Sequence, residues 1–375
     1  MKLAITHLRS INGLYGAEQV LLELCRQQVE RYDDTRLLVF SAPGRPEPPL
    51  YAEARSRHLP AELLRCHGPI DPRCIVAIRR RLREAGYGTR VILHCHDYKS
   101  IIYGGLASAG LPVVRIATLH GWLNDSRRLR LYHWLEARML HHFQRVCAVS
   151  PAIAERLLEI GLEPDAIRRV DNGIDTDRFQ PTTTPDRSRQ DDCHDIRHDN
   201  RLQLGTAARL SPEKNLGLLI GAIAECRSRG RLIDLTIVGE GPLHGELQSL
   251  VDQLDLTDQV SLPGNQRGLE TWYPQLDAFV LPSLREGMPL SVLEALACGC
   301  PVIASAVGAI PDLLEGIPGC STVPAGNREA LVDALMSLEP RQQPVHAARD
   351  RVNDLYSGAR MATRYTGIYR EAILA

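Results

Sequence analysis

Residues 282–314 read PSLREGMPLSVLEALACGCPVIASAVGAIPDLL, and this stretch determines the interpretation of the whole chain. It predicts a strand that ends near Pro282, a loop over Glu286–Pro289 and a helix that carries Glu294. An apolar run, PVIASA, follows the helix and predicts the next strand. A strand, a loop, a helix and a second strand in this order are typical of a parallel α/β domain.

The start of the predicted helix is suited to binding an anion. Pro289 fits a helix start because the first turn makes no use of the N–H group that proline lacks. The backbone N–H groups near Leu290 and Ser291 have no helical partners, so they form a site for a diphosphate. Glu286 and Glu294 flank this site and can accept hydrogen bonds from sugar hydroxyls.

Short apolar strands alternate with amphipathic helices on both sides of this stretch. A length of 375 residues fits two domains, and the alternation predicts a parallel sheet covered by helices in each. A polar segment with two prolines follows Phe179, as expected of a linker. We therefore predict an α/β chain of two doubly wound Rossmann-like domains facing a central cleft. The expected segments are a first domain over 1–180, a linker over 181–200, a second domain over 201–355 and a C-terminal helix over 356–375 that returns to the first domain.

Residues 286–303, EGMPLSVLEALACGCPVI, resemble the E-x7-E signature of the retaining GT-B glycosyltransferases of family four, which build bacterial polysaccharides and glycolipids. Glu286 is followed eight residues later by Glu294, and a tail of small residues leads into the next strand. The resemblance implies the GT-B fold, a contact of Glu286 with the donor sugar and a contact of Glu294 with the nucleotide ribose. The alternative, two surface charges, is disfavoured by the length of the match.

A second motif, TAARLSPEKNLGLLIGAI, places Arg209 and Lys214 between a strand and a helix of the second domain. It resembles the R-x4-K element with which the same family holds the donor diphosphate. Cleavage of the sugar–phosphate bond leaves negative charge on the departing diphosphate, and fixed cations lower that barrier. Ordinary surface charges are the alternative, but cations at a helix N-terminus oppose the helix dipole unless an anion is present.

Two residues of the first domain join the candidate site through weaker motifs. NGLYGAEQVLLELC resembles the glycine-rich loop of the family, with Gly16 kept and Tyr15 in place of the other glycine. ATLHGW ends a strand at His120, which matches the histidine that lies beside the sugar in the family. The alternative for His120 is a histidine that only caps a strand end.

The resemblance implies a retaining, metal-independent hexosyltransferase without a cofactor, acting by front-face displacement from a UDP- or GDP-sugar. We expect the acceptor to be a glycan or a lipid-linked sugar. A sugar-nucleotide epimerase or hydrolase on the same fold, or a non-catalytic sugar-nucleotide binding subunit, is the alternative. The expected catalytic residues are Glu286, His120, Arg209 and Lys214. The expected donor-binding residues are Gly16, Arg209, Lys214, Glu286, Gly287, Met288, Pro289, Leu290, Ser291 and Glu294.

The charges are unevenly divided between the two halves of the chain. Residues 1–180 carry 26 Lys and Arg against 20 Asp and Glu, a balance of +6, which leaves 18 against 25, or −7, for the remainder. A basic first half suits an anionic lipid surface, and residues 126–145 mix five arginines with apolar side chains. A helix packed on the first sheet, with solvated charges, is the alternative. We expect a cytoplasmic protein without a nucleic-acid partner, and peripheral contact with the inner face of the cell membrane is left open.

Three motifs that imitate other sites are interpreted as structural. The ten cysteines show no CxxC pair, and Cys193, His194 and His198 lie in the predicted linker. VILHCHD places His94 and His96 at alternate positions, which fits a buried strand end. We therefore predict no metal site. The glycines of LTIVGEGPLHGEL imitate a dinucleotide fingerprint, but the partner acid is missing and a simple strand turn is expected.

Overall fold

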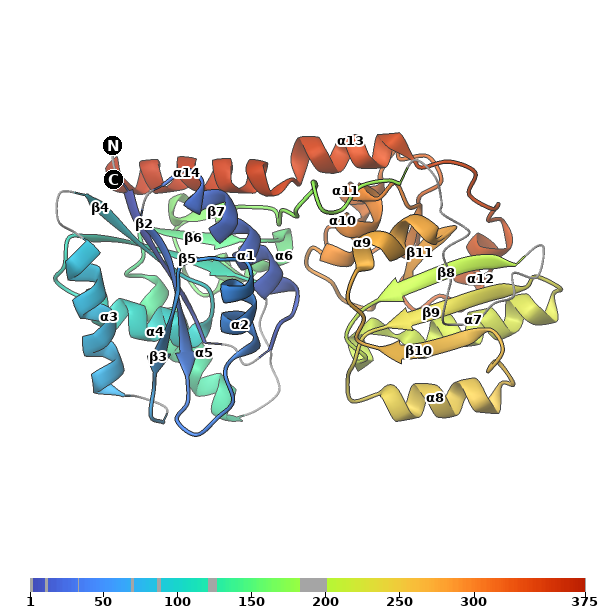
Figure 1. The fold of residues 1–375 in the computed structure, drawn as a ribbon, viewed down its shortest axis with the longest axis horizontal. Coiled ribbons are helices and arrows are strands. Elements are labelled where there is room, and N and C mark those ends of the chain that lie inside the picture. Colours follow the sequence, from blue (N-terminus) through green and yellow to red (C-terminus); the bar gives the residue numbers. More distant parts are fainter. Residues whose placement is uncertain are drawn as a thin grey trace. The chain divides into compact units, whose positions relative to one another are not determined.

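The computed structural model describes residues 3–10, 13–32, 34–68, 71–85, 89–120, 127–182 and 201–374, and of 127–131 only the backbone. The chain divides into two compact units (Figure 1). The first unit comprises Met1–Gly173 together with Gly358–Ala375, and the second comprises Ile174–Ser357.

The first unit is built on a parallel sheet in the order β3-β2-β1-β4-β5-β6-β7. Its central strands are buried nearly throughout, as expected of a parallel sheet covered on both faces. The strand order reverses between β1 and β4, and ligands of such sheets bind beyond the strand ends at this switch point. The strands are β1 (Leu3–Arg9), β2 (Asp34–Ser41), β3 (Ala61–Arg65), β4 (Arg90–Cys95), β5 (Val113–Leu119), β6 (Arg145–Ala148) and β7 (Ile167–Arg169).

The helices of the first unit pack in two groups against this sheet (Figure 1). α3 contacts α4, which contacts α5, whereas α1 contacts the C-terminal helix α14. In α3 the buried side chains are Cys74, Ile78, Leu82 and Ala85, whose helical spacing makes one apolar stripe. The helices are α1 (Gly16–Val29), α2 (Pro49–Ser56), α3 (Pro72–Ala85), α4 (Tyr98–Ser108), α5 (Arg127–Leu140), α6 (Pro151–Glu159), the 3-10 turn η1 (Pro164–Ala166) and α14 (Gly358–Leu374).

The second unit repeats this architecture with a parallel sheet in the order β10-β9-β8-β11-β12-β13. Its switch point lies between β8 and β11. The β11–α10–β12 segment corresponds to the predicted strand, helix and strand of residues 282–314. The strands are β8 (Leu202–Ala207), β9 (Ile233–Val238), β10 (Val260–Gly264), β11 (Ala278–Leu281), β12 (Val302–Ser305) and β13 (Ser321–Val323).

The helices of the second unit include the short helix that carries the E-x7-E motif. That helix, α10, is buried along most of its length and packs against α13. The helices are α7 (Leu216–Ser228), α8 (His244–Gln253), α9 (Leu269–Trp272), α10 (Leu290–Ala297), α11 (Ile310–Leu314), α12 (Arg328–Met336) and α13 (His346–Leu355), with the 3-10 turns η2 (Pro212–Lys214) and η3 (Tyr273–Gln275).

The chain crosses between the units at Gly173 and again at Ser357. At the second unit's edge the two segments run in parallel, with a bridge between Ile174 and Ser357 and a 3.0 Å hydrogen bond from the Ile174 N–H to the Tyr356 carbonyl. The unit boundary therefore precedes the boundary predicted at residue 180. Most of the predicted linker, including Cys193, lies outside the described residues.

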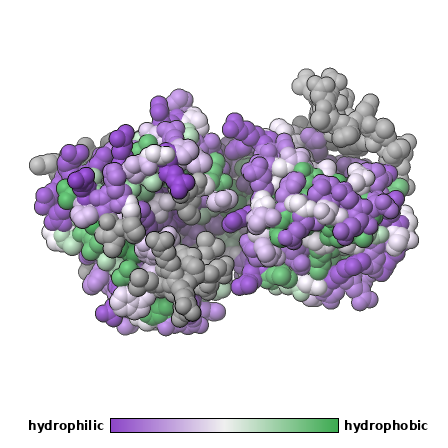
Figure 2. Space-filling view, turned by 90° about the horizontal axis from the view of Figure 1, so that it is seen from below, coloured by the Kyte–Doolittle hydropathy of each residue, from purple (hydrophilic) through white to green (hydrophobic). Residues whose placement is uncertain are grey.

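Polar side chains dominate the surface. On the face shown in Figure 2, hydrophilic residues cover most of both units, with smaller hydrophobic patches among them. Within the part of the chain that the structure describes, none of the helices is both long and apolar enough to cross a membrane. The nine described cysteines are free, and eight of them are buried as small hydrophobic side chains.

Candidate active site

The candidate site of the second unit lies at its switch point, where loops follow β8 and β11. The Lys214 ammonium donates a 2.6 Å hydrogen bond to Oε1 of Glu286, and the Ser283 hydroxyl donates to the same oxygen at 2.6 Å. The Glu286 and Lys214 side chains are 8% and 19% exposed, so the ion pair is only partly shielded from water. Residues from two separate sequence motifs thus meet at one carboxylate.

Backbone contacts fix the loop that carries Glu286. The Leu284 N–H donates to the Glu213 carbonyl at 2.8 Å, which ties the loop after β11 to the loop after β8. The Ala309 N–H donates to the Gly287 carbonyl at 2.9 Å. Gly308 has a φ of +59°, and a Cβ there would lie 2.2 Å from the Glu286 carbonyl oxygen. A side chain at Gly308 is therefore incompatible with this loop.

Arg209 lies just beyond β8 and is exposed. Its charge acts on Glu213, which lies in the same loop after β8 as Lys214, and helps to lower the pKa of that carboxyl. Desolvation raises the pKa of Glu213, but the Ser211 hydroxyl and the charges of Lys214 and Arg209 outweigh it, so that the net pKa is lowered. Arg209 and Lys214 thus form one positive region at the end of β8.

α10 begins beside this region, after a buried Met288 and the half-buried Gly287. Pro289 is the N-cap and not the first helical residue, and it provides no side-chain cap. Leu290 and Ser291 form the first turn. Their N–H groups are those that an α-helix leaves without intrahelical partners, which makes this end a suitable place for an anion.

Glu294 belongs to a different group of side chains from Glu286. It accepts a 2.8 Å hydrogen bond from the Tyr273 hydroxyl, and Arg178 and Glu270 form a 2.8 Å ion pair near it. Desolvation raises the pKa of the Glu294 carboxyl, while the Tyr273 hydroxyl and the Arg178 charge oppose that rise. The carboxylate is thus held in a fixed position by a buried tyrosine.

In the first unit, Gly16 is the exposed first residue of α1, and Tyr15 is its N-cap. The Tyr15 N–H donates to Glu18 at 2.9 Å, and the buried Glu18 carboxylate in turn binds the Arg9 guanidinium at 2.5 Å. The loop that precedes Gly16 is therefore anchored through a buried ion pair at the end of β1.

His120 follows β5 directly and stacks beside His96, with 6.0 Å between the ring centroids. Its Nε2 atom is buried and has no hydrogen-bond partner among the described residues. Burial and the nearby Arg9 charge lower the pKa of His120 to about 3, so its ring is neutral at pH 7.

His7, His94 and His96 place ring nitrogens within 4.8 Å of one another at the ends of β1 and β4. All three are fully buried, in line with the expected buried strand end. Ring nitrogens of all three are engaged in hydrogen bonds: His7 contacts His96 and Gln28, and both nitrogens of His94 have hydroxyl partners. Protein groups thus engage every ring nitrogen of the three except Nδ1 of His96, which has no hydrogen-bond partner among the described residues.

Several residues of these sites were not predicted. Ser283, Gly308 and Tyr273 contact the motif residues through the fold. Arg178 pairs with Glu270, and its charge acts on Glu294. Only Ser283 and Gly308 carried a local signal, because each follows a strand in the quoted stretch. Gly239 and Gly241 pack their Cα atoms against the backbone of Ala208 and Leu210. These glycines therefore support the loop after β8, as expected of a strand turn.

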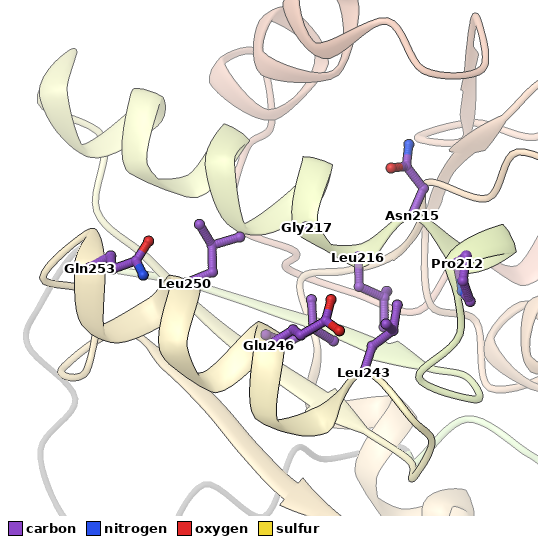
Figure 3. Close-up of a pocket in the computed structure, with 9 residues that line it drawn as sticks. Pro212, Asn215, Leu216, Gly217, Leu243, Glu246, Leu250 and Gln253 are labelled. Carbon is purple, nitrogen blue, oxygen red and sulfur yellow. The ribbon is translucent and has the colours of Figure 1, made fainter.

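An open pocket lies next to η2, between the N-terminal parts of α7 and α8 (Figure 3). Leu216, Leu243 and Leu250 give it an apolar lining, and Glu246 projects into it from α8. It does not include Arg209, Lys214 or Glu286, so it is separate from the candidate site. The complete lining is Pro212, Asn215, Leu216, Gly217, Leu243, Glu246, Leu247, Leu250 and Gln253.

Two sequence families match consecutive parts of the chain. The family described as "Glycosyltransferase Family 4" matches residues 15–178, and the family described as "Glycosyl transferases group 1" matches residues 201–339. Together they cover both units and include the R-x4-K and E-x7-E motifs.

Curated relatives agree with these matches. The amylovoran biosynthesis glycosyltransferase AmsK of Erwinia amylovora is 28% identical over 56% of this chain and 50% of its own length. A UDP-Gal:alpha-D-GlcNAc-diphosphoundecaprenol alpha-1,3-galactosyltransferase of Escherichia coli is 29% identical over 63% of this chain and 62% of its own length. The match thus spans between half and two thirds of these relatives.

The crystal structure of Anabaena HepE in complex with UDP has the same fold. It superposes with a TM-score of 0.81 at 18% identity and covers 98% of this chain and 100% of its own. Its low identity makes it an indicator of fold alone. The two sequence families, the two parallel sheets and this superposition lead to one conclusion: the chain belongs to the family-4 type of GT-B glycosyltransferases.

Proposed function

We propose that the protein transfers a sugar from a UDP- or GDP-sugar to a glycan or lipid-linked acceptor in the synthesis of a surface polysaccharide or glycolipid. The observation that carries this proposal is the meeting of Lys214 and Glu286 beside the start of α10 at the β8/β11 switch point. A cation, a helix N-terminus and a hydroxyl-binding carboxylate are what a sugar diphosphate requires. The relatives support the reaction class, since the Escherichia coli relative is a galactosyltransferase named for a UDP-Gal donor and an alpha-D-GlcNAc-diphosphoundecaprenol acceptor.

In the proposed reaction the second unit stabilises the leaving group. Arg209, Lys214 and the N–H groups of Leu290 and Ser291 would bind the diphosphate, whose negative charge grows as the glycosidic bond breaks. Without donor, Glu286 neutralises Lys214, and binding of a diphosphate would release Glu286 to accept from a sugar hydroxyl. Glu294 would bind the ribose.

We propose that transfer proceeds with retention of configuration and without a metal ion. The leaving diphosphate oxygen would accept the proton of the acceptor hydroxyl on the face where the bond forms. In the first unit, His120 would contact the sugar and Gly16 would leave room for a phosphate near the start of α1. NMR of the purified product would test retention through the anomeric configuration, and inversion would refute it.

The central experiment measures nucleotide release and sugar transfer from UDP- and GDP-sugars, with chelator present. We expect Lys214→Met and Arg209→Met each to lower the transfer rate by about 10²–10³-fold, as loss of an electrostatic donor does. Lys99→Met is the matched control, because Lys99 belongs to α4 in the first unit and its ammonium lies over the rings of Phe40 and Tyr103, away from the residues assigned to the diphosphate. Full activity in a folded Lys214→Met variant would contradict the assignment, and donor consumption without transfer to any acceptor would indicate a hydrolase.

We further propose that the α3–α4–α5 face of the first unit rests on an anionic membrane to reach a lipid-linked acceptor. Exposed arginines and exposed apolar side chains alternate there, a pattern that suits the lipid headgroup region. Arg138 lies 5.5 Å over the ring of Trp134, which is 56% exposed. The exposed basic and apolar side chains are Arg73, Val76, Arg80 and Arg83 on α3, Leu106 on α4, and Trp134 and Arg138 on α5. An exposed acidic residue, Glu84, also lies on α3 and pairs with Arg80 at 3.6 Å.

Sedimentation with phospholipid vesicles tests this face. We expect binding to vesicles with anionic lipid and not to neutral ones, and we expect Arg80→Glu with Arg83→Glu to reduce it by roughly ten- to a hundredfold, because each basic residue near the surface contributes about 1 kcal/mol. Arg45→Glu with Arg55→Glu makes the same charge change at exposed positions outside the α3–α4–α5 face. Equal binding of the two double variants would contradict this face.

A further inference from the structure

A chain of buried polar side chains crosses the first unit at the β1/β4 switch point. The Gln28 amide nitrogen donates to the Tyr369 hydroxyl at 3.1 Å, and the Gln28 carbonyl oxygen lies 2.7 Å from Nε2 of His7. Nδ1 of His7 lies 2.9 Å from Nε2 of His96. The chain thus runs from α14 through α1 and β1 to the end of β4, and each of its side chains is at most 2% exposed.

The orientation of the Gln28 amide determines where the protons lie. Because the Gln28 oxygen is an acceptor, Nε2 of His7 must carry a proton and donate to it. A neutral His7 then has no proton on Nδ1, which accepts from the Nε2–H of His96. A neutral His96 consequently has an unprotonated Nδ1.

Both rings are neutral at pH 7. Burial lowers the pKa of His7 to about 4, although the bond to Gln28 opposes it. Burial, the neighbouring histidines and the Arg9 charge lower the pKa of His96 well below its ordinary value. A third histidine, His94, is engaged separately by the Tyr369 and Thr118 hydroxyls and so does not compete for His96.

The unprotonated Nδ1 of His96 is buried and has no hydrogen-bond partner among the described residues. A buried acceptor without a partner costs about 1–3 kcal/mol, so such an atom in a native fold calls for a ligand or another explanation. Nε2 of His120, which follows the adjacent strand β5, is also buried without a hydrogen-bond partner among the described residues, and the two rings are stacked. Two unpartnered nitrogens thus lie at the carboxyl ends of neighbouring strands, where ligands of parallel sheets bind.

We propose that His96 is a further sugar-contacting residue, whose Nδ1 accepts a hydrogen bond from a sugar hydroxyl, and that Tyr369, Gln28 and His7 are positioning residues that hold it in the Nε2–H tautomer. The ligand class follows from the chemistry, since a bare imidazole nitrogen offers a lone pair but no proton, which suits a hydroxyl donor rather than a phosphate oxygen. The assignment of this hydroxyl to a sugar rests on the proposed function.

The test reads the histidine tautomers directly by long-range ¹H–¹⁵N NMR of protein labelled at histidine. In the free wild type we expect His96 to be protonated at Nε2 and bare at Nδ1. On addition of the sugar nucleotide that the wild type uses, the Nδ1 resonance should shift as it becomes an acceptor, while the Nε2–H stays in place. An Nδ1–H tautomer in the free protein would overturn the relay.

Variants separate the relay from general stability. Gln28→Leu removes the acceptor for His7, and Tyr369→Phe perturbs the same relay from α14 in case the first variant does not fold. We expect each to lower kcat/KM about tenfold, the equivalent of one net hydrogen bond, and to populate the other His96 tautomer. Gln27→Leu is the matched control, because Gln27 is also buried on α1 but contacts Glu23.

The outcomes distinguish this proposal from the proposed function. An Nδ1 resonance that does not move while the wild type transfers sugar would overturn the role of His96 alone. A wild type that neither binds nor transfers any sugar would overturn the proposed function, and the sugar contact of His96 with it. Normal kcat/KM in both relay variants, with the tautomer changed, would overturn the positioning role.

Discussion

Substitution of Gly308 by alanine should disturb the candidate site by displacing the backbone of the loop that carries Glu286. The added Cβ would lie 2.2 Å from the Glu286 carbonyl oxygen and 2.7 Å from that of Gly287. Both are backbone atoms, so the peptide itself must move by roughly 1 Å to reach ordinary contact, and overpacking of this kind costs about 1–3 kcal/mol. The left-handed conformation at φ +59° adds about 1–2 kcal/mol. We expect a total loss of about 2–5 kcal/mol in the free energy of unfolding.

Gly316→Ala is the control for the part of this loss that comes from the left-handed backbone conformation alone. Gly316 has a φ of +69°, and a Cβ there would have no neighbour within 4 Å. Urea unfolding should therefore show the smaller loss for Gly316→Ala and a further loss of about 1–3 kcal/mol for Gly308→Ala. Only Gly308→Ala should raise KM for the donor, because it moves the peptide that carries Glu286. Equal unfolding free energies and equal KM values in the two variants would refute the reasoning.

Two other measurements test the buried polar groups. Tyr273→Phe removes the hydroxyl that donates to Glu294, and urea unfolding should show a loss of about 1 kcal/mol, with weaker nucleotide binding in a calorimetric titration; unchanged binding would argue against a ribose contact of Glu294. Because the folded pKa of His7 is about 4, the unfolded chain takes up its proton first as the pH falls, so the wild type should lose about 2 kcal/mol between pH 7 and pH 5 from this residue alone. His7→Gln should remove that part of the pH dependence, and an unchanged slope would mean that His7 is charged in the fold.

The central strands were predictable from sequence, and so was the edge strand β10 from the run QVSLPG, but the other three edge strands were not. VILHCH and VVRIATLH are apolar runs, and they form β4 and β5 in the middle of the first sheet. β3, β7 and β13 were missed, and each lies at the edge of its sheet with mostly half-buried or exposed side chains. An edge strand needs few apolar residues because one side of it meets solvent, so its sequence resembles a loop.

The motif residues were predictable, but their partners were not. Two sequence motifs of the family contain Arg209, Lys214 and Glu286. The spacing within each motif was enough to identify these residues, without knowledge of which residues are in contact. The ion pair between Lys214 and Glu286 depends on β8 and β11 being neighbours in the sheet, which the strand order decides and the local sequence does not. The same holds for Tyr273, whose contact with Glu294 is set by the packing of η3 on α10.

The sequence pattern predicted only part of the histidine cluster in the first unit. Alternate positions predicted that His94 and His96 lie at a buried strand end, and they do. The alternation gave no indication that His7, in another strand, is paired in register with His94. It is this register that builds the hydrogen-bonded relay, because it places a third imidazole within reach of His96.

The two switch points differ in electrostatics. At β8/β11 the cations Arg209 and Lys214 remain partly exposed, which avoids the large cost of burying a charge before an anion arrives. At β1/β4 the histidines are fully buried and neutral, and the buried Arg9 charge beside them is paired with Glu18. A diphosphate suits solvated cations that become fully paired on binding, whereas a bare imidazole nitrogen suits a hydroxyl donor. The difference between these two groups of side chains is therefore a physical argument for a charged ligand group at Arg209 and Lys214, and for a hydroxyl at the unpartnered nitrogens of the first switch point.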